Sequence, residues 1–165
     1  MFKSIRTALA AAALCVPSPA LPILDVQIDF DAGSRYDPPP QSGLASATAQ
    51  MMAKGVAAAG DAPALDEGAL EDAWADLAAS FGGDAGRDRM SFSLRTLTDP
   101  AILPQAVALA ARQLGQPSWP EAVWAREREQ WSAAIQESLT RPGTVAARAF
   151  AQAVYGGHPY GVRTL

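Results

Sequence analysis

Few residues in this chain have side chains that could carry out catalysis. The sequence contains one histidine, His158, and one cysteine, Cys15. A histidine that acts as a general base needs a nucleophile and an orienting acid nearby, and the chain has no G-x-S-x-G motif to supply a serine nucleophile. His158 also lies in a run rich in glycine and proline, from 156 to 161. We therefore interpret it as a turn residue that packs beside Pro159 and Tyr160.

A predicted helix over residues 43–54 brings three further residues to one face. Ser46, Ala49 and Gln50 occupy positions i, i+3 and i+4 of this helix. A hydrolytic zinc site takes about three protein ligands from His, Cys, Asp and Glu and needs a base for its water. Serine, alanine and glutamine supply neither charge nor imidazole. We predict that this face binds no metal, that it is not catalytic, and that the protein uses no cofactor.

The elements that would position this face follow from the pattern of apolar residues. The pattern predicts a strand, two helices, a strand or hairpin and then three helices, which favours an α+β fold with helices packed on one face of an antiparallel sheet. The predicted ranges are 24–31, 43–54, 67–80, 83–98, 99–114, 118–141 and 143–154. Glycines 82 and 83 are expected to end the second helix, and Asp66 and Asp99 to cap the second and third.

Apolar stripes predict which side of each helix meets the core. On the first helix the stripe consists of Leu44, Thr48, Met51 and Met52. On the second it consists of Leu70, Trp74, Leu77 and Phe81, and on the long helix of Trp124, Trp131, Ile135 and Leu139. The acidic and basic residues from 121 to 129 are expected to form a solvated helix face. Glu127, within that run, is a candidate for a residue that supports a neighbouring site.

The first twenty residues have the features of a secretory leader. Lys3 and Arg6 precede a short apolar run over residues 8–16, and small residues follow at 18–20. The apolar run is too short for a lasting membrane span. We expect cleavage after Ala20, a periplasmic location, and one domain over residues 21–165. Cys15 is preceded by Leu14 rather than by a small residue, so lipidation is not expected.

The charge of the mature chain excludes several classes of function. Removal of Lys3 and Arg6 leaves 11 basic and 17 acidic residues and no cysteine. Without a basic cluster to neutralise phosphates, nucleic-acid binding is not expected. No basic amphipathic helix suggests membrane docking either, and we expect no stable membrane insertion.

Three blocks of the sequence resemble the pitrilysin/insulinase-type metallopeptidases, the inverzincins. The first block contains Gly33-Ser34-Arg35, Gly43-Leu44-Ala45, Met51 and Lys54-Gly55; the second contains Phe81-Gly82-Gly83 and Arg87-Asp88-Arg89; the third contains Arg126-Glu127-Arg128-Glu129, Pro142 and His158-Pro159-Tyr160-Gly161. In that family an H-x-x-E-H helix carries two zinc ligands and a catalytic glutamate.

The resemblance places the family's motif on residues that cannot perform its chemistry. Its two histidines fall on Ser46 and Gln50, and its glutamate falls on Ala49. The third zinc ligand, seven residues after the glutamate that matches Glu127, falls on Ala134. The resemblance therefore implies a peptidase scaffold without its metal site, comprising the N-terminal part of one family domain and incomplete at its C-terminus.

The resemblance also implies a function. The expected protein is an inactive subunit that forms a periplasmic heterodimer with a zinc-bearing sibling, completes the peptidase chamber and helps to bind extended peptide. Residues 83–89 are the expected sheet edge for that peptide, although charged edges are also a protection against aggregation. Two alternatives remain open: an active zinc metalloendopeptidase with displaced ligands, and a purely structural assembly subunit.

Overall fold

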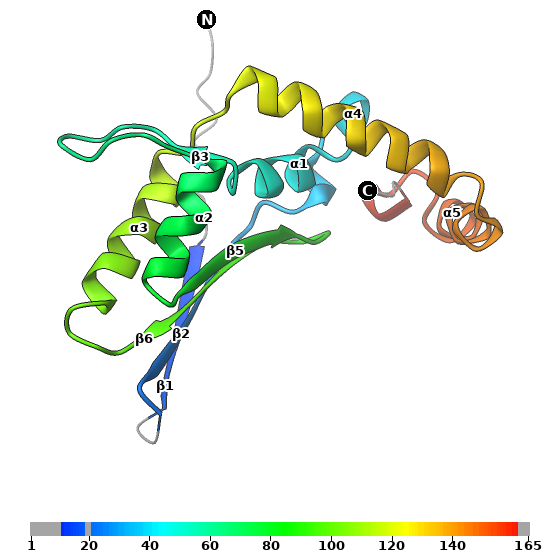
Figure 1. Cartoon of the computed structure of the whole chain (residues 1–165). Coiled ribbons are helices and arrows are strands. Elements are labelled where there is room, and N and C mark those ends of the chain that lie inside the picture. The colour runs from blue at the N-terminus through cyan, green and yellow to red at the C-terminus, as the bar shows by residue number, and fades with distance from the viewer. Residues whose placement is uncertain (1–10, 19–20, 162–165) are drawn as a thin grey trace, which may run out of the picture.

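The computed structural model describes the backbone of residues 11–18 and 21–161 and the side chains of residues 21–161. In this part of the chain, helices pack on one face of an antiparallel sheet, as the sequence predicts (Figure 1). The helices are α1 (Leu44–Met51), α2 (Glu67–Asp76), α3 (Leu103–Gly115), α4 (Glu121–Ser138) and α5 (Pro142–Tyr155). The strands are β1 (Ala11–Ser18), β2 (Ile23–Phe30), β3 (Gly55–Val56), β4 (Leu65–Asp66), β5 (Ser80–Ala85) and β6 (Met90–Leu97).

The main sheet has the strand order β1-β2-β6-β5, and every neighbouring pair is antiparallel. Strand β6 alternates between buried Met90, Phe92 and Leu94 and polar residues on the other face. Because successive side chains of a strand point to opposite faces, this alternation leaves one wet face and one face for the helices. Helices α1 and α2 pack against β5, and α3 packs against β6.

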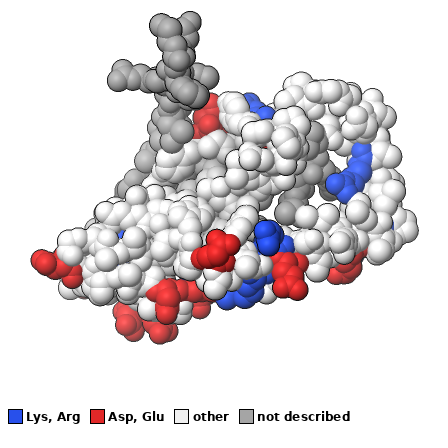
Figure 2. Space-filling model, turned by 90° about the horizontal axis from the view of Figure 1, so that it is seen from above, with Lys and Arg blue, Asp and Glu red and all other residues white. Residues whose placement is uncertain are grey.

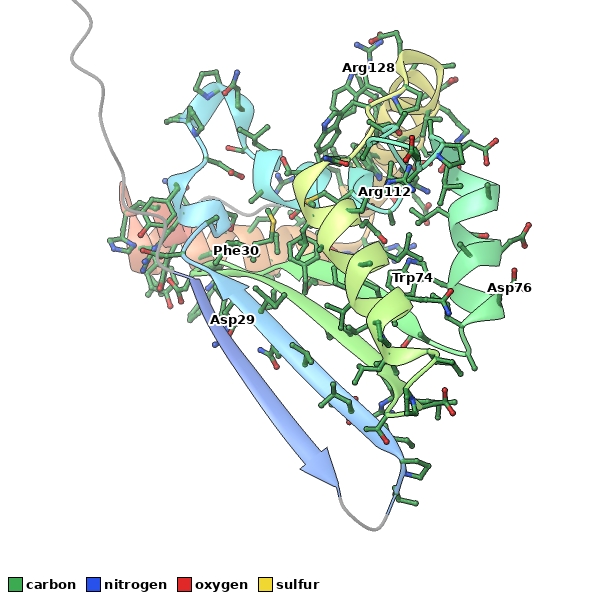
Figure 3. All side chains as sticks on the ribbon, turned by 90° about the vertical axis from the view of Figure 1, so that its left-hand side faces the viewer. Asp29, Phe30, Trp74, Asp76, Arg112 and Arg128 are labelled. Atoms are coloured by element: carbon green, nitrogen blue, oxygen red, sulfur yellow. The ribbon has the colours of Figure 1, made fainter. Side chains whose placement is uncertain are left out.

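The core consists of two neighbouring clusters on the helix side of the sheet. One joins α2 and α3 to β6 through Leu70, Trp74, Leu94, Ala106 and Ala110 together with Val56. In Figure 3, Trp74 lies between α2 and α3, where its indole N–H donates to buried Gln113 at 2.9 Å. The other cluster joins α1 to the sheet through Ala45, Ala49, Met52, Met90 and Phe92.

Two predicted helix boundaries are wrong. Helix α2 is capped by Asp66 as predicted, but it ends at Asp76, and Ala78 adopts a left-handed conformation with φ 45°. Phe81, Gly82 and Gly83 consequently lie in β5 instead of ending the helix. Asp99 accepts hydrogen bonds from the N–H groups of residues 101 and 102 in a turn, and α3 begins only at Leu103.

Helix α4 runs past α1, and α5 lies beyond it, away from α2 and α3 (Figure 1). On α4, the predicted apolar residues Trp124, Trp131 and Ile135 are half-buried, and Leu139 is exposed. Among the helices that the structure describes, none combines the length and hydropathy needed to span a membrane.

Residues 11–18, which overlap the predicted leader, form strand β1. They pair with β2 over eight residues, from Ala11 opposite Phe30 to Ser18 opposite Ile23. The basic residues of the leader and the predicted cleavage site at Ala20 lie outside the described residues. Cleavage after Ala20 stays a prediction, and it would remove the strand that covers the outer edge of β2.

Candidate functional site

The helix α1 carries the three motif positions, and its orientation differs from the predicted one. The side chains of Ser46 and Ala49 are buried, at 8% and 3% exposure, whereas Leu44 of the predicted core stripe is 48% exposed. Only Met51 and Met52 of that stripe are buried. The small size of Ser46 and Ala49 lets α1 lie close to the sheet, so the face with the motif positions is the packed one.

The start of α1 is fixed by a carboxylate that the sequence pattern does not reveal. Asp37 accepts hydrogen bonds from the backbone N–H of Gly43 at 2.8 Å and of Ala45 at 3.0 Å. These two donors are among those that a helix leaves unsatisfied at its N-terminus. Gly43 is the N-terminal flanking residue, but the cap itself comes from six to eight residues earlier in the chain.

The motif position Gln50 brings α1 into contact with α4. Its side-chain Oε1 accepts a hydrogen bond from Trp131 Nε1 at 3.0 Å. Ala134 lies one turn after Trp131 on the same side of α4, because residues three apart are neighbours on a helix surface. The placement of the third ligand position on Ala134 stays a prediction. The Oε1 of Gln50 is used between two helices, and Ala134 is exposed.

A hollow of about 290 Å³ opens between the end of α1 and β5. We call it the α1–β5 groove; its lining residues are Ala49, Gln50, Met52, Ala53, Lys54, Gly82, Gly83, Phe92 and Gln113. Two larger hollows, of about 410 and 590 Å³, lie on the polar face of the sheet and along α4 and contain none of the motif positions. The α1–β5 groove is therefore the relevant site, since Ala49 and Gln50 form part of its wall.

Strand β5 forms the outer edge of the sheet beside this groove. One side of its backbone pairs with β6, from Ser80 opposite Arg95 to Ala85 opposite Met90. The predicted edge at 83–89 thus overlaps only the end of β5, and its remaining residues form the turn to β6. Gly83 has no side chain to cover the strand, and the ring of Phe92 from β6 lies where its Cβ would be, only 2.2 Å away.

Gln113 is a residue of this site that sequence reasoning missed. It is 2% exposed, accepts from Trp74 and donates from Nε2 to the carbonyl of Met52 at 3.1 Å. It therefore joins α1, α2 and α3 at the floor of the groove. The only sequence signal is a polar residue in line with Ala106 and Ala110 on the buried side of α3, and that signal does not identify its partners.

Next to the groove, whose lining includes Lys54, four charged side chains form an ion-pair network. It joins the end of α1 to the start of α2 and to α4. Lys54 Nζ lies 2.5 Å from Glu67 and 3.3 Å from Glu127, and Arg126 Nη2 lies 2.7 Å from each of the same carboxylates. Glu127 is only 7% exposed, so the expectation of a fully solvated face over 121–129 is wrong at this residue. Its carboxylate stays charged because both cations are close.

The pKa values in the network shift in the direction that pairing requires. Hydrogen bonds from Arg126 and then Lys54 lower the pKa of Glu127 below its ordinary value. Those from Lys54 and then Arg126 lower the pKa of Glu67. The pKa of Lys54 is raised, chiefly by Glu67. The network is therefore a structural connection between charged partners and leaves no base free to activate water.

The three blocks of the family resemblance meet at one place, which we call the framing cluster; it consists of Asp31, Arg35, Tyr36, Asp88 and Tyr160. Arg35 contacts Asp31 at 2.8 Å and Asp88 at 3.1 Å, and Tyr36 donates to Asp31 at 2.9 Å. The Tyr160 hydroxyl donates a hydrogen bond to the carboxylate of Asp88, which also contacts Arg35. That hydrogen bond raises the pKa of the Tyr160 hydroxyl.

Gly33 allows the framing cluster to form. A Cβ at this residue would lie 2.3 Å from the backbone oxygen of Arg87, in the turn between β5 and β6. Next to it, the N–H groups of Ser34 and Arg35 donate to the carbonyls of Gly86 and Arg87 at 3.0 and 2.9 Å. Glycine is required because two backbone segments approach each other directly.

The environment of His158 agrees with its interpretation as a turn residue. Its ring packs edge-on against Tyr160, with centroids 4.9 Å apart, and its Nδ1 accepts from the Tyr160 backbone N–H at 3.2 Å. Within the described side chains of residues 21–161, no group of three or more His, Cys, Asp and Glu is placed to hold a metal ion. Ser46, Ala49 and Gln50 share one stretch of α1, and the hydrogen bond between Gln50 and Trp131 connects this stretch to α4.

No curated protein matches this sequence, but two solved structures are similar to it. The structure is similar to a peptidase M16 inactive domain from Pseudomonas fluorescens, with 32% sequence identity and a TM-score of 0.80 over 87% of this chain and 33% of that one. It also shares its fold with a protease from Helicobacter pylori, with 17% identity and a TM-score of 0.70 over 92% of this chain and 38% of that one.

The chain therefore spans about a third of the length of these two solved structures. The family model for insulinase, peptidase family M16, matches residues 16–165, which is most of the sequence. Residues from all three resembling blocks meet in the framing cluster. The chain belongs to the insulinase family of peptidases, family M16.

Proposed function

We propose that this protein is an inactive peptidase subunit that binds extended peptide at the α1–β5 groove and pairs with a zinc-bearing sibling in the periplasm. The observation that carries the proposal is the contrast at α1. The helix is capped, packed and joined to α4 as a working scaffold requires, yet Ser46, Ala49 and Gln50 hold the motif positions. A sibling with an intact motif would supply the chemistry that these residues lack.

Peptide binding at the groove is supported by the geometry of β5. An edge strand offers unpaired backbone donors and acceptors along its length, and an extended peptide can add to it as a further strand. The groove lies alongside this edge and offers small residues, Ala49, Ala53 and Gly82, that leave room for the peptide's side chains. The same backbone edge would accept many sequences, with selectivity set by the groove.

The peptide proposal is tested by filling the groove. The probe is a fluorescently labelled, unstructured peptide of alternating apolar and polar residues, titrated with the protein. Ala53 is exposed and lines the groove, so Ala53→Phe should fill it and weaken binding about tenfold without disturbing the core. Ala58→Phe, at an exposed position that does not line the groove, is the matched control. Equal losses in both variants would refute binding at this site.

The sibling is tested by co-purification from a periplasmic extract and by peptide-cleavage assays on each protein alone and on the mixture. The proposal expects co-elution and faster cleavage by the mixture, with the sibling's zinc content unchanged when this protein is deleted. Co-elution without any gain in cleavage would favour a structural assembly subunit. Stoichiometric zinc and cleavage by this protein alone would favour displaced ligands.

A further inference from the structure

The floor of the α1–β5 groove is apolar and firmly packed. Phe92 and Met52, which line it, are both buried, and the ring of Phe92 stacks on Phe81 with centroids 5.8 Å apart. Gln113, the polar residue of the floor, has both ends of its amide in use, since it accepts from Trp74 and donates to the carbonyl of Met52. The floor therefore offers a ligand packing surface, while its polar groups are paired within the chain.

The charged residue in the wall of the groove is balanced by its neighbours. Lys54 Nζ lies 2.5 Å from Glu67 and 3.3 Å from Glu127, and Arg126 pairs with the same two carboxylates. A charge on a ligand would lose hydration in the groove without gaining an unpaired opposite charge. The groove is therefore suited to an uncharged, apolar side chain, and the orientation of such a ligand is fixed by a small number of polar groups.

Gln50 is an exposed lining residue with a polar atom left for a ligand. Its Oε1 accepts from Trp131 Nε1 at 3.0 Å. Because an indole nitrogen can only donate, this contact fixes which end of the Gln50 amide faces α4. The other end, Nε2, donates no hydrogen bond to a described residue. In Figure 1, α1 lies between α4 and β5, so the amide nitrogen is the end that is not turned toward α4.

We propose that Gln50 determines how the groove holds its peptide: Nε2 donates to a backbone carbonyl, and the adjacent side chain of the peptide packs over Phe92 and Met52. The inference rests on the proposed peptide binding and names the ligand class, extended peptides with an uncharged, apolar side chain at this point. Zinc polarises a carbonyl and supplies an activated water, whereas a neutral amide gives the carbonyl one hydrogen bond. At this motif position the chain would therefore hold a peptide without cleaving it.

The test uses the labelled peptide described above and the full-length protein, so that the groove is measured in its complete surroundings. Gln50→Glu keeps an oxygen that accepts from Trp131 but replaces the amide donor with a second acceptor. It should weaken peptide binding about tenfold. Gln136→Glu, at an exposed position of α4 that does not line the groove, adds the same charge and should leave the affinity unchanged. Equal affinities for Gln50→Glu and the unchanged protein would refute the role of Gln50.

A modified peptide separates a direct hydrogen bond from a change in the shape of the groove. Replacing one carbonyl oxygen of the peptide with sulfur makes a thioamide, which is a weaker acceptor. In a series of peptides with a single thioamide, the one next to the central apolar residue should bind the unchanged protein more weakly. The same thioamide should have no effect on binding to Gln50→Glu, because the two changes remove one interaction. Equal losses in both proteins would refute the contact.

Peptides that differ only in their central residue test the ligand class. A central leucine should bind at least about tenfold more tightly than a central lysine or glutamate. A preference for either charged residue, or equal affinity for all three peptides, would refute the apolar assignment. These outcomes leave the proposed groove standing, because it depends on the loss of binding in Ala53→Phe. A full-length protein that binds none of the peptides would refute the proposed peptide binding and this inference together.

Discussion

The motif positions on α1 and the framing cluster lie in the same protein but present different kinds of side chain. At α1, the three motif positions hold Ser46, Ala49 and Gln50, which are used for packing and for a contact with α4. In the framing cluster, Arg35, Asp88 and Tyr160 form a connected set of hydrogen bonds. The first group carries no charge and no imidazole, whereas the second group uses charged and hydroxyl side chains to hold segments together.

The comparison teaches that these two groups of residues are physically separable. Replacing a metal ligand with a small or neutral residue leaves no buried charge unpaired, so the fold tolerates it. Removing a member of an ion-pair network leaves its partners without compensation. In Figure 2, several of the basic residues in view lie close to acidic ones, and much of the remaining surface is uncharged. The following predictions separate the two groups, from the largest expected effect to the smallest.

Glu127→Ala should produce the largest loss of stability, because Lys54 and Arg126 would lose a carboxylate that is only 7% exposed. We expect the free energy of unfolding to fall by about 2 kcal/mol, less than for a fully buried pair because Arg126 reaches solvent and Glu67 remains. Urea denaturation measures the change. Glu129→Ala, exposed on the same helix, should change the free energy by less than about 0.5 kcal/mol. Similar losses in both variants would contradict a role for the network.

Gly83→Ala should destabilise the sheet where Gly82→Ala does not. A Cβ at Gly83 would lie 2.2 Å from the Phe92 ring, whereas a Cβ at Gly82 would have no atom within 4 Å. Displacing a packed ring costs about 1–2 kcal/mol. Thermal unfolding of the two variants provides the comparison, and a Gly83→Ala variant as stable as Gly82→Ala would show that the ring moves freely.

Acid should weaken the network that joins α1 to α4. The folded-state pKa values of Glu67 and Glu127 are below their ordinary value of 4.5. The contribution of these two carboxylates to the stability of the folded state is therefore complete above about pH 4.5. It is lost as the pH falls through their lowered folded-state pKa values. Glu127→Ala should show a shallower loss of stability below 4.5 than the unchanged protein, measured by urea midpoints. Parallel pH profiles would argue against this source of acid sensitivity.

At alkaline pH the sign is reversed for Lys54. Its pKa is raised above 10.5, so its stabilisation is complete below that value and is lost as the pH rises through the higher folded-state value. Lys54→Met should therefore remove part of the alkaline loss of stability, with the same urea measurement. An unchanged alkaline profile would assign the loss to other groups.

The smallest expected effect is local. Tyr160→Phe removes the hydrogen bond to Asp88 but keeps the ring packed near His158. Hydrogen exchange should become faster in the segment 158–161, with little change in the core strand β6. Tyr155→Phe, whose hydroxyl donates no hydrogen bond to a described residue, is the control. Faster exchange in β6 as well would show that the framing cluster contributes to global stability.

Much of the fold could be predicted from the sequence because its elements have strong local signals. The alternation of Met90, Phe92 and Leu94 predicts β6, and the Asp66 cap predicts the start of α2. The end of α2 could not be predicted, because Phe81 continues the helical stripe of Leu70, Trp74 and Leu77 while its ring stacks on Phe92 within the sheet. Tertiary packing overrides a local pattern at that residue.

The candidate site could be predicted only in part. Ser46, Ala49 and Gln50 are found from helical spacing and the family resemblance, but the direction of α1 was predicted wrongly. Leu44 is more apolar than Ser46, yet Ser46 is buried, because small residues permit close packing against the sheet. Asp37 caps a helix that starts several residues later, and Gln113 donates to the carbonyl of Met52, far away along the chain; no local pattern identifies such partners.

The zinc affinity of two designed variants tests most directly whether the scaffold survives without its chemistry. The first carries Ser46→His, Ala49→Glu and Gln50→His, and the second adds Ala134→Glu. Because the ion pair of Lys54, just after α1, with Glu127 on α4 remains in both variants, the fourth change should supply a third ligand and tighten zinc binding by at least about tenfold. Equal zinc affinities for the two variants would contradict the predicted alignment of α1 and α4.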